Sequence, residues 1–289
     1  MIYSFPSLIS GDRDGPALNR VWALVSASHP APCVAVPALT ALLAAQAAPH
    51  GIGPVLAGPA LLAGQLSIGW SNDARDGARD TEARRPDKPV ARGDISAHSL
   101  WAAACTAAAA GLAMALLIGP LTAALYALGV VLGWSYNLGL KSSPWSWVTY
   151  LLAFGSLPAY AASTLPGHPA PHWPITVAAA LIGFGAHFAN VLPDLAADQA
   201  AGVRGLPQRV AARWGPAAVR SIAVTALLAA SALLLAGATR RWVAVPGLVA
   251  AVLLAVAAAR GTGRAPFLAA IGIAAVDVIL FIAAGESLA

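Results

Sequence analysis

The chain has 289 residues, of which 58% are hydrophobic and only 10% are charged; its formal net charge is +5 and its mean hydropathy is +0.71. A soluble globular domain carries about 25% charged residues, so a single water-soluble core is excluded. The basic balance does not call for a nucleic-acid partner, because the cations fall where membrane topology would place them.

Apolar segments long enough to cross a bilayer recur along the chain, since a helix of about 20 residues spans a hydrocarbon core of about 30 Å. The sequence predicts nine such helices, over residues 21–46, 54–72, 97–117, 120–138, 145–164, 174–194, 215–237, 242–259 and 265–285. Cys33 and Cys105 both fall inside predicted helices, which disfavours a disulfide framework. We therefore predict an all-α polytopic membrane protein, folded as one domain over residues 1–289.

Lysine and arginine residues are distributed unevenly between the predicted connections. Of the 17, only Arg240 and Arg241 lie in the connections of one side. The others lie in the N-terminal tail, or in or beside the connections after the second, fourth, sixth and eighth helices. By the positive-inside rule these regions face the cytoplasm. We predict an integral multi-pass protein of a bacterial-type cell membrane with a cytoplasmic N-terminus, and the sequence points to no obligate protein partner.

One polar spacing, N-x-x-x-D-x-x-x-D, occurs twice, at the predicted cytoplasmic ends of the second and sixth helices. Its members are Asn72, Asp76 and Asp80 in the first copy, and Asn190, Asp194 and Asp198 in the second. Residues four apart stack on nearly one face of a helix, where like charges repel unless a cation lies among them. Carboxylate and amide oxygens suit Mg²⁺. We predict two acidic edges that face each other across Mg²⁺ and a diphosphate; the alternative is two ordinary solvated helix ends.

Basic residues follow both acidic segments and the fourth predicted helix. Arg and Lys contact phosphate oxygens through charge-assisted hydrogen bonds. We predict diphosphate contacts for Arg85, Lys88, Lys141 and Arg204, against the alternative that each is only a topological charge. Arg75 and Arg79 point away from the stacked acidic face of a regular helix, so two roles stay open for them: contact with the diphosphate, or simple neutralisation of the acids.

Taken together, the motifs resemble those of a known family. They are N-D-A-R-D-G-A-R-D followed by R-R-P-D-K-P, a central Y-N-L-G-L-K, and D-L-A-A-D followed by G-V-R-G-L-P. This set resembles the UbiA superfamily of intramembrane prenyltransferases, and the resemblance covers essentially the whole chain. It implies helices around a central cavity, cytoplasmic cap loops after helices 2 and 6, and an apolar tunnel for a prenyl tail that is open to the bilayer. It also implies that the acids hold Mg²⁺ against the diphosphate of an isoprenoid.

The resemblance assigns roles to individual residues. The expected metal ligands or their direct supports are Asn72, Asp73, Asp76, Asp80, Asn190, Asp194 and Asp198. The expected catalytic residues are Asp76, Asp80, Asp194, Asp198, Tyr136 and Lys141. Tyr136 and Lys141 would contact the diphosphate, although they are five residues apart where the family motif is often Y-x-x-x-K. Asp73 lies off the stacked face and would bind a metal or brace the loop.

Three polar residues inside predicted helices carry weaker signals. His187 lies one turn before Asn190, and both are expected near the substrate; the alternative for His187 is a hydrogen bond to a neighbouring helix. His29, in the segment S-H-P, is interpreted as a polar residue at a kink. Asp277 is interpreted as a structural acid in the ninth helix.

The function implied is Mg²⁺-dependent transfer of a prenyl group from an isoprenyl diphosphate to a small acceptor, expected to be aromatic, through an allylic carbocation. The first alternative is a terpene cyclase of the same family, which needs no separate acceptor. A membrane transporter is a remote alternative, because transporters place charged sites near the bilayer midplane, whereas both acidic segments here lie at one face.

Overall fold

A computed structural model of the chain describes residues 16–47, 51–236, 241–285 and 287–289. Every regular element in these ranges is helical. The elements are α1 (Pro16–Ala27), α2 (Pro30–Ala47), α3 (Ile52–Glu82), α4 (Pro89–Arg92), α5 (Ala97–Ile118), α6 (Pro120–Leu138), the 3₁₀ turn η1 (Leu140–Ser142), α7 (Ser146–Gly155), α8 (Leu157–Ala162), α9 (Trp173–Val191), α10 (Leu195–Ala200), α11 (Leu206–Ala236), α12 (Arg241–Arg260) and α13 (Ala265–Ala283).

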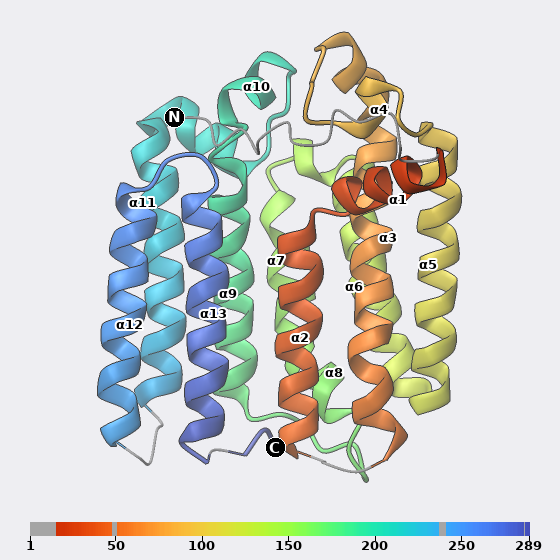
Figure 1. The fold of residues 1–289 in the computed structure, drawn as a ribbon. Helices are drawn as coiled ribbons and strands as arrows, with labels where there is room; N and C mark the ends of the chain where they lie inside the picture. Colours follow the sequence, from red (N-terminus) through yellow and green to blue (C-terminus); the bar gives the residue numbers. More distant parts are fainter. Residues whose placement is uncertain (1–15, 48–50, 237–240, 286) are drawn as a thin grey trace.

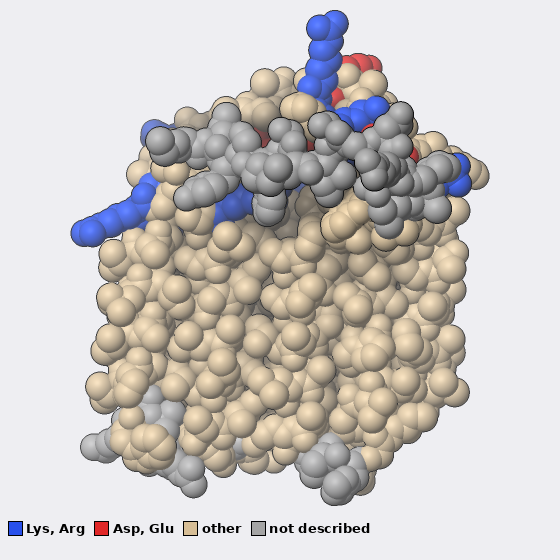
Figure 2. Space-filling model, viewed as in Figure 1, with Lys and Arg blue, Asp and Glu red and all other residues tan. Residues whose placement is uncertain are grey.

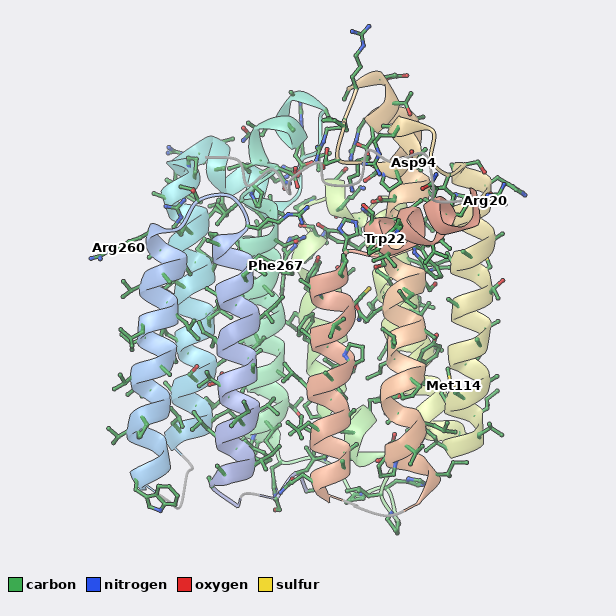
Figure 3. All side chains as sticks on the ribbon, in the orientation of Figure 1. Arg20, Trp22, Asp94, Met114, Arg260 and Phe267 are labelled. Atoms are coloured by element: carbon green, nitrogen blue, oxygen red, sulfur yellow. The ribbon has the colours of Figure 1, made fainter. Side chains whose placement is uncertain are left out.

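The long helices run side by side as one bundle, and the short helices α1, α4 and α10 lie at one of its ends (Figure 1). Lys and Arg gather at that end, above a body whose visible described surface carries no charged side chain (Figure 2). The labelled Arg20, Asp94 and Arg260 lie toward this end, whereas Met114 lies in the other half (Figure 3). This charged end is called the polar end below.

The body of the bundle exposes apolar side chains, as a protein in lipid does. Leu117 is 68% exposed, Leu253 is 64% exposed and Val131 is 60% exposed. Two tryptophans are also largely exposed: Trp173, the first residue of α9, and Trp242, the second residue of α12. Exposed tryptophans at helix ends are expected at a membrane interface. Together with the long apolar helices, this surface identifies an integral membrane protein.

Six helices in the described ranges are long and apolar enough to cross a membrane, or seven if a bent pair counts as one. The prediction of about nine spans is therefore only partly met. The bent pair stands where one helix was predicted over 21–46: α1 and α2 are bent by 68° relative to each other. His29 lies at this bend with a φ of 55°, so its interpretation as a kink residue agrees with the structure. Short α7 and α8 stand where one span was predicted over 145–164.

The two acidic segments differ in backbone from what the sequence predicts. The second predicted helix should end at residue 72, but α3 continues to Glu82, so the whole first segment is helical. The sixth predicted helix should continue to residue 194, but α9 ends at Val191. A turn that contains Pro193 follows, and Asp194 then occupies the N-cap position of the separate helix α10, without a capping hydrogen bond from its side chain. Proline lacks an N–H and disfavours helix in the residue before it, which accounts for the break.

Close helix packing sets the position of the side chains around the interior. A Cβ atom on Gly183 of α9 would lie 2.5 Å from the carbonyl oxygen of Tyr150 in α7, so only glycine allows this approach. Asn137 of α6 donates to the Ile68 carbonyl and to Ser71 Oγ, both at 2.9 Å, and thereby joins α6 to α3. Asp277 accepts a hydrogen bond from Ser231 at 3.0 Å, which links α13 to α11.

Candidate active site

A cavity of about 480 Å³ opens within the bundle beneath the polar end, between α2, α3, α6, α7, α9 and the start of α13. Most of the residues predicted from the sequence line it. They are Asn72, Asp76, Asp80, Arg85, Lys88, Tyr136, Lys141, Asn190, Asp194 and Asp198. Three predicted residues do not line it: Asp73, His187 and Arg204. The cavity thus joins a charged end to an apolar interior.

The first acidic segment presents Asn72, Asp76 and Asp80 to the cavity from a single helix face, as their spacing predicts. Lys141 Nζ donates to both carboxylate oxygens of Asp76, at 2.7 and 2.6 Å, and lies 3.5 Å from Asn72 Oδ1. Arg79 lines the same cavity and its guanidinium lies 3.0 Å from Asp76, so the prediction that it points away was wrong. Its long, flexible side chain folds back along the helix to reach the acid one turn away.

The second acidic segment reaches the cavity although it is split between a turn and α10. Gln208 Nε2 donates to Asp198 Oδ2 at 2.9 Å and holds that carboxylate in place. Burial raises the pKa of Asp198, an effect that Gln208 opposes and the neighbouring charge of Asp194 reinforces. A carboxylate whose charged form is disfavoured in this way gains stability from any cation placed beside it. Asn190 Nδ2 donates to the Tyr150 hydroxyl at 3.4 Å.

Arg85 connects the two acidic segments. Its guanidinium donates to both carboxylate oxygens of Asp87, each at 2.9 Å, and also to Asp194 Oδ1 at 3.3 Å. The paired hydrogen bonds lower the pKa of Asp87 to about 2. The segment after α3 is therefore joined to the segment after α9 by an ion pair that crosses the mouth of the cavity.

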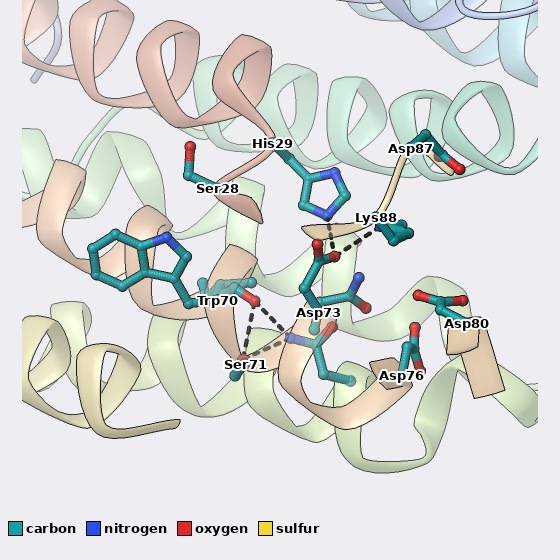
Figure 4. A network of polar contacts seen from close by, with 12 residues as sticks. Ser28, His29, Trp70, Ser71, Asp73, Asp76, Asp80, Asp87 and Lys88 are labelled. Carbon is teal, nitrogen blue, oxygen red and sulfur yellow. Dashed lines mark hydrogen bonds and ion pairs between the residues drawn. The ribbon is translucent and has the colours of Figure 1, made fainter. Parts of the chain in front are cut away.

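Asp73 itself does not line the cavity, but its carboxylate points toward His29 and Lys88, which do line it (Figure 4). It is 2% exposed, and its Oδ1 accepts from Lys88 Nζ at 2.7 Å and lies 3.1 Å from His29 Nε2. This ion pair ties the loop before α4 and the bend between α1 and α2 to α3. Of the two roles left open for Asp73, the geometry fits the brace.

Replacing Lys88 by alanine should loosen this end of the molecule, because it leaves the buried Asp73 carboxylate with His29 alone. Losing one partner of a buried ion pair costs about 3 kcal/mol. We expect a lower melting temperature in detergent and faster tryptic cleavage between residues 83 and 96. The matched control is Asp94→Ala, which removes an exposed pair with Arg92, leaves every tryptic site in place and should change little. Equal behaviour of the two variants would contradict the brace.

An aromatic wall follows the charged mouth toward the interior. Tyr136 and Tyr150 both line the cavity, with ring centroids 5.2 Å apart in an edge-to-face arrangement. His187 packs behind them, with ring centroids 5.7 Å from Tyr136 and 4.8 Å from Tyr150, and lies 3.1 Å from Ser146 Oγ. The alternative considered for His187, a bond to a neighbouring helix, is what the structure has. Sequence reasoning missed Tyr150, which no motif marks.

Arg204 is exposed on the loop between α10 and α11, and its carbonyl oxygen accepts from Arg209 Nε at 2.8 Å. Sequence reasoning also missed Gln208, because only the fold brings it to Asp198. Arg264, at the start of α13, lines the cavity as well and adds a positive charge at the mouth. The cations around the cavity therefore come from four separate parts of the chain.

The donor set suits a hard divalent ion that shares its coordination with a ligand. Within the described ranges, no three His, Cys, Asp or Glu side chains converge on one point, so protein acids alone do not form a complete cage. Mg²⁺ is usually held by one or two carboxylates together with substrate phosphates, and it keeps several waters. Carboxylates of both segments line one cavity with Asn72 and Asn190, which fits that mode of binding.

The sequence profile of the UbiA prenyltransferase family matches residues 34–276. The chain belongs to this family. The resemblance seen in the motifs is thereby confirmed, and with it the enzyme class, a prenyltransferase. No curated protein matches the chain in sequence.

Solved structures of UbiA homologues share the fold. One from Archaeoglobus fulgidus, bound to DMAPP and Mg²⁺, superposes with a TM-score of 0.68 at 16% identity, over 90% of this chain and 98% of that one. Another from Aeropyrum pernix K1, without ligand, gives 0.69 at 18% identity, over 87% and 96%. A digeranylgeranylglyceryl phosphate synthase gives 0.63 at 15% identity, over 91% and 98%. The likeness spans nearly the full length of each family member.

Proposed function

We propose that this family member transfers a prenyl group from an isoprenyl diphosphate to a small acceptor, with Mg²⁺ as cofactor and an allylic carbocation as intermediate. The observation that carries the proposal is the cavity, in which acids from α3 and from the α9–α10 segment meet Lys141 and Arg85 directly above an aromatic and apolar interior. UbiA homologues from Archaeoglobus fulgidus bind DMAPP or GPP together with Mg²⁺, which supports the same ligands here.

The diphosphate is assigned to the charged mouth. Asp76 and Asp80 on one side and Asp194 and Asp198 on the other would hold Mg²⁺ against its oxygens, with Asn72 and Asn190 as further ligands or supports. Mg²⁺ when bound neutralises charge on the leaving diphosphate. Lys141 would contribute in the same way. Its ammonium already contacts Asp76, and it would move onto a phosphate oxygen once a metal binds that carboxylate.

Further cations would complete the diphosphate site. Arg85 and Lys88 line the mouth, and Arg79 joins them there although the sequence analysis did not assign it to phosphate. Arg204 does not reach the cavity, so we leave it out of the proposed set. The loops after α3 and α9 would act as a cap, because the Arg85–Asp194 pair already spans them.

The aromatic wall would act on the prenyl group itself. When the allylic C–O bond breaks, its electron pair leaves with the diphosphate and a cation remains on the prenyl carbon. The ring faces of Tyr136 and Tyr150 lie along the cavity just inside the mouth and can stabilise positive charge there. The apolar interior keeps water from the cation until the acceptor attacks. For the acceptor we propose a small aromatic ring, whose electron-rich carbon forms the new C–C bond and then loses its proton.

We further propose that the polar end faces the cytoplasm. The charge distribution supports this orientation, because Lys and Arg gather at that end in the described part of the chain. A bacterial-type cell membrane is the proposed location.

The test is a turnover assay on the purified protein in detergent with Mg²⁺ and C5, C10, C15 and C20 diphosphates. Diphosphate release is followed alone and with a panel of phenolic acids and quinols. We expect release that depends on an acceptor, together with a prenylated product. Rapid Mg²⁺-dependent release without acceptor, giving a cyclic hydrocarbon, would replace the transferase by a terpene cyclase. Uptake of substrate into vesicles without any diphosphate release would contradict both.

A further inference from the structure

One polar side chain in the interior of the cavity has no role in the site described above. Gln65 of α3 lines the cavity and is only partly buried, between Leu61 and Ile68 of the same helix face. Its amide makes no hydrogen bond to any residue in the part of the chain that the structure describes. A polar residue among apolar ones in a helix long and apolar enough to cross a membrane is a candidate functional residue.

Gln65 lies two helical turns below the charged mouth. It precedes Asn72 by seven residues, so the two share one face of α3 and are about 10 Å apart along the helix axis. The charged residues with which α3 lines the cavity all follow Asn72: they are Asp76, Arg79 and Asp80. This helix therefore presents charge to the upper part of the cavity and one uncharged amide to the part below.

Three other polar side chains of the cavity lining already donate to the backbone. The Tyr126 hydroxyl donates to a carbonyl of α5 at 3.1 Å, and the Tyr160 hydroxyl donates to a carbonyl of α3 at 3.1 Å. Ser156 Oγ donates to the carbonyl three residues before it at 2.8 Å. Their hydroxyl protons are thus engaged. The amide of Gln65 offers two N–H donors and one oxygen acceptor to a ligand.

A prenyl tail does not account for this amide. The tail is hydrocarbon throughout, and an amide held against hydrocarbon without a hydrogen-bond partner is unfavourable. The cavity also opens sideways between α2 and α13, where exposed Ala31 and exposed Leu268 line it, so a tail can leave toward lipid there (Figure 1). The second substrate, which carries polar groups, is the better partner for Gln65.

We propose that Gln65 recognises the acceptor by a hydrogen bond to an uncharged polar group, so that the enzyme prefers a neutral phenol or quinol to an aromatic carboxylate. This inference rests on the proposed function, since it takes the diphosphate to lie at the mouth. Reacting carbons approach to about 3–3.5 Å, which leaves room for one aromatic ring between the level of Asn72 and that of Gln65. With the phenol hydroxyl toward the diphosphate, a substituent across the ring points at the amide.

The absence of charge on Gln65 sets the preference between acceptors. A carboxylate at this depth would be removed from water beside an uncharged amide, which is unfavourable unless a cation pairs with it. The cations that line the cavity come from the segments of the polar end, and they are assigned to the diphosphate or lie at the mouth. A carbonyl or hydroxyl group carries no such cost and can use the donors and the acceptor of the amide.

Three para-substituted phenols of similar size separate charge from hydrogen bonding. 4-Hydroxyacetophenone carries a neutral carbonyl, 4-hydroxybenzoate carries a carboxylate, and 4-ethylphenol carries an apolar group. Each is titrated calorimetrically into the purified full chain in detergent with Mg²⁺ and a C10 thiolodiphosphate, an analogue that takes the place of the first substrate without reacting. We expect the wild type to bind 4-hydroxyacetophenone about 10-fold more tightly than either of the other two probes.

Two substitutions of Gln65 should change the preference in different ways. Gln65→Leu removes the hydrogen bond, so binding of 4-hydroxyacetophenone should weaken about 10-fold while 4-ethylphenol binds at least as tightly as before. Gln65→Arg adds a cation at the same depth, so 4-hydroxybenzoate should gain about 10-fold. A merely structural role for Gln65 would weaken all three probes together. Leucine and arginine both favour a helix, which helps these variants to fold.

The matched control is Leu62→Ala on the same helix. Leu62 is 39% exposed and does not line the cavity, so its replacement should leave binding of all three probes unchanged. Gln65→Leu should bind the C10 analogue itself as the wild type does, because the diphosphate site is two turns away. Melting temperatures in detergent show whether each variant is folded.

The outcomes distinguish this inference from the proposed function. Equal affinity of the wild type for the three probes, or an unchanged profile in Gln65→Leu, would overturn the inference and leave the proposed function standing. The same holds if the protein binds the C10 analogue but none of the three phenols. Failure to bind the C10 analogue in the presence of Mg²⁺ would instead overturn the proposed function, and with it this inference.

Discussion

Replacing Asp76 by asparagine should lower kcat/KM for the prenyl diphosphate at least about 100-fold, the scale expected when one preorganised charge-stabilising group is lost. Asparagine keeps the size of the side chain but removes the negative charge that Lys141 contacts through both carboxylate oxygens. The measurement is steady-state turnover in detergent with saturating Mg²⁺. Because the substitution would remove a proposed metal ligand, it should also raise the Mg²⁺ concentration needed for half-maximal activity.

The matched control for that variant is Asp94→Asn. Asp94 lies at the same end of the molecule and pairs with Arg92 at 2.6 Å, but it does not line the cavity. Its replacement should leave turnover within about twofold of the wild type, as expected for an exposed pair. Activity of Asp76→Asn within threefold of the wild type would contradict the role proposed for the first acidic segment.

Asp198→Asn is expected to have the second large effect, again at least about 100-fold in kcat/KM, because it removes the partly buried charge of the second acidic segment. Gln208 holds this carboxylate at 2.9 Å, so the position is fixed before any ligand arrives. The informative variant is the double substitution of Asp76 and Asp198. If both acids act on one diphosphate through Mg²⁺, the second substitution should add far less than its effect alone. Fully multiplicative losses would indicate two independent sites.

The sequence predicted the first acidic segment well because it lies inside one regular helix. In α3 the spacing of Asn72, Asp76 and Asp80 converts directly into a shared face, which the structure turns toward the cavity. The same rule placed Arg79 on the far side, and it failed there. The position of the Cα atom largely fixes where the carboxylate of a short aspartate side chain lies. An arginine side chain is long enough to bring its guanidinium back to an acid one turn away.

The second segment shows where spacing alone is insufficient. The predicted helix runs to residue 194 and the acidic spacing assumes helical stacking up to Asp198, whereas α9 ends at Val191 and a turn at Pro193 separates it from α10. The acids still reach the cavity, because the turn redirects the chain across its mouth. The partners of these acids could not be predicted, since Gln208 and Arg85 come from other segments of the chain and no local pattern records such contacts.

Contacts between residues far apart in the sequence also determine the surroundings of Asp73 and of Tyr126. Asp73 is adjacent to Asn72 in sequence, yet its carboxylate is buried against His29 and Lys88 and does not itself line the cavity. Tyr126 carries no motif, and its buried position follows from Gly64 and Gly111 on two other helices, which admit its ring. Composition and periodicity therefore predicted an all-helical membrane protein with one polar end, while the identity of the cavity wall needed the fold.

The most direct test of the proposed site is calorimetric binding of a C10 diphosphate, with and without Mg²⁺, to the wild type and to Asp76→Asn and Asp198→Asn. We predict binding that requires Mg²⁺ and weakens at least about 10-fold in each variant, because both acidic segments hold the metal against one diphosphate. Binding that is equally tight without Mg²⁺, or unchanged in either variant, would contradict this site.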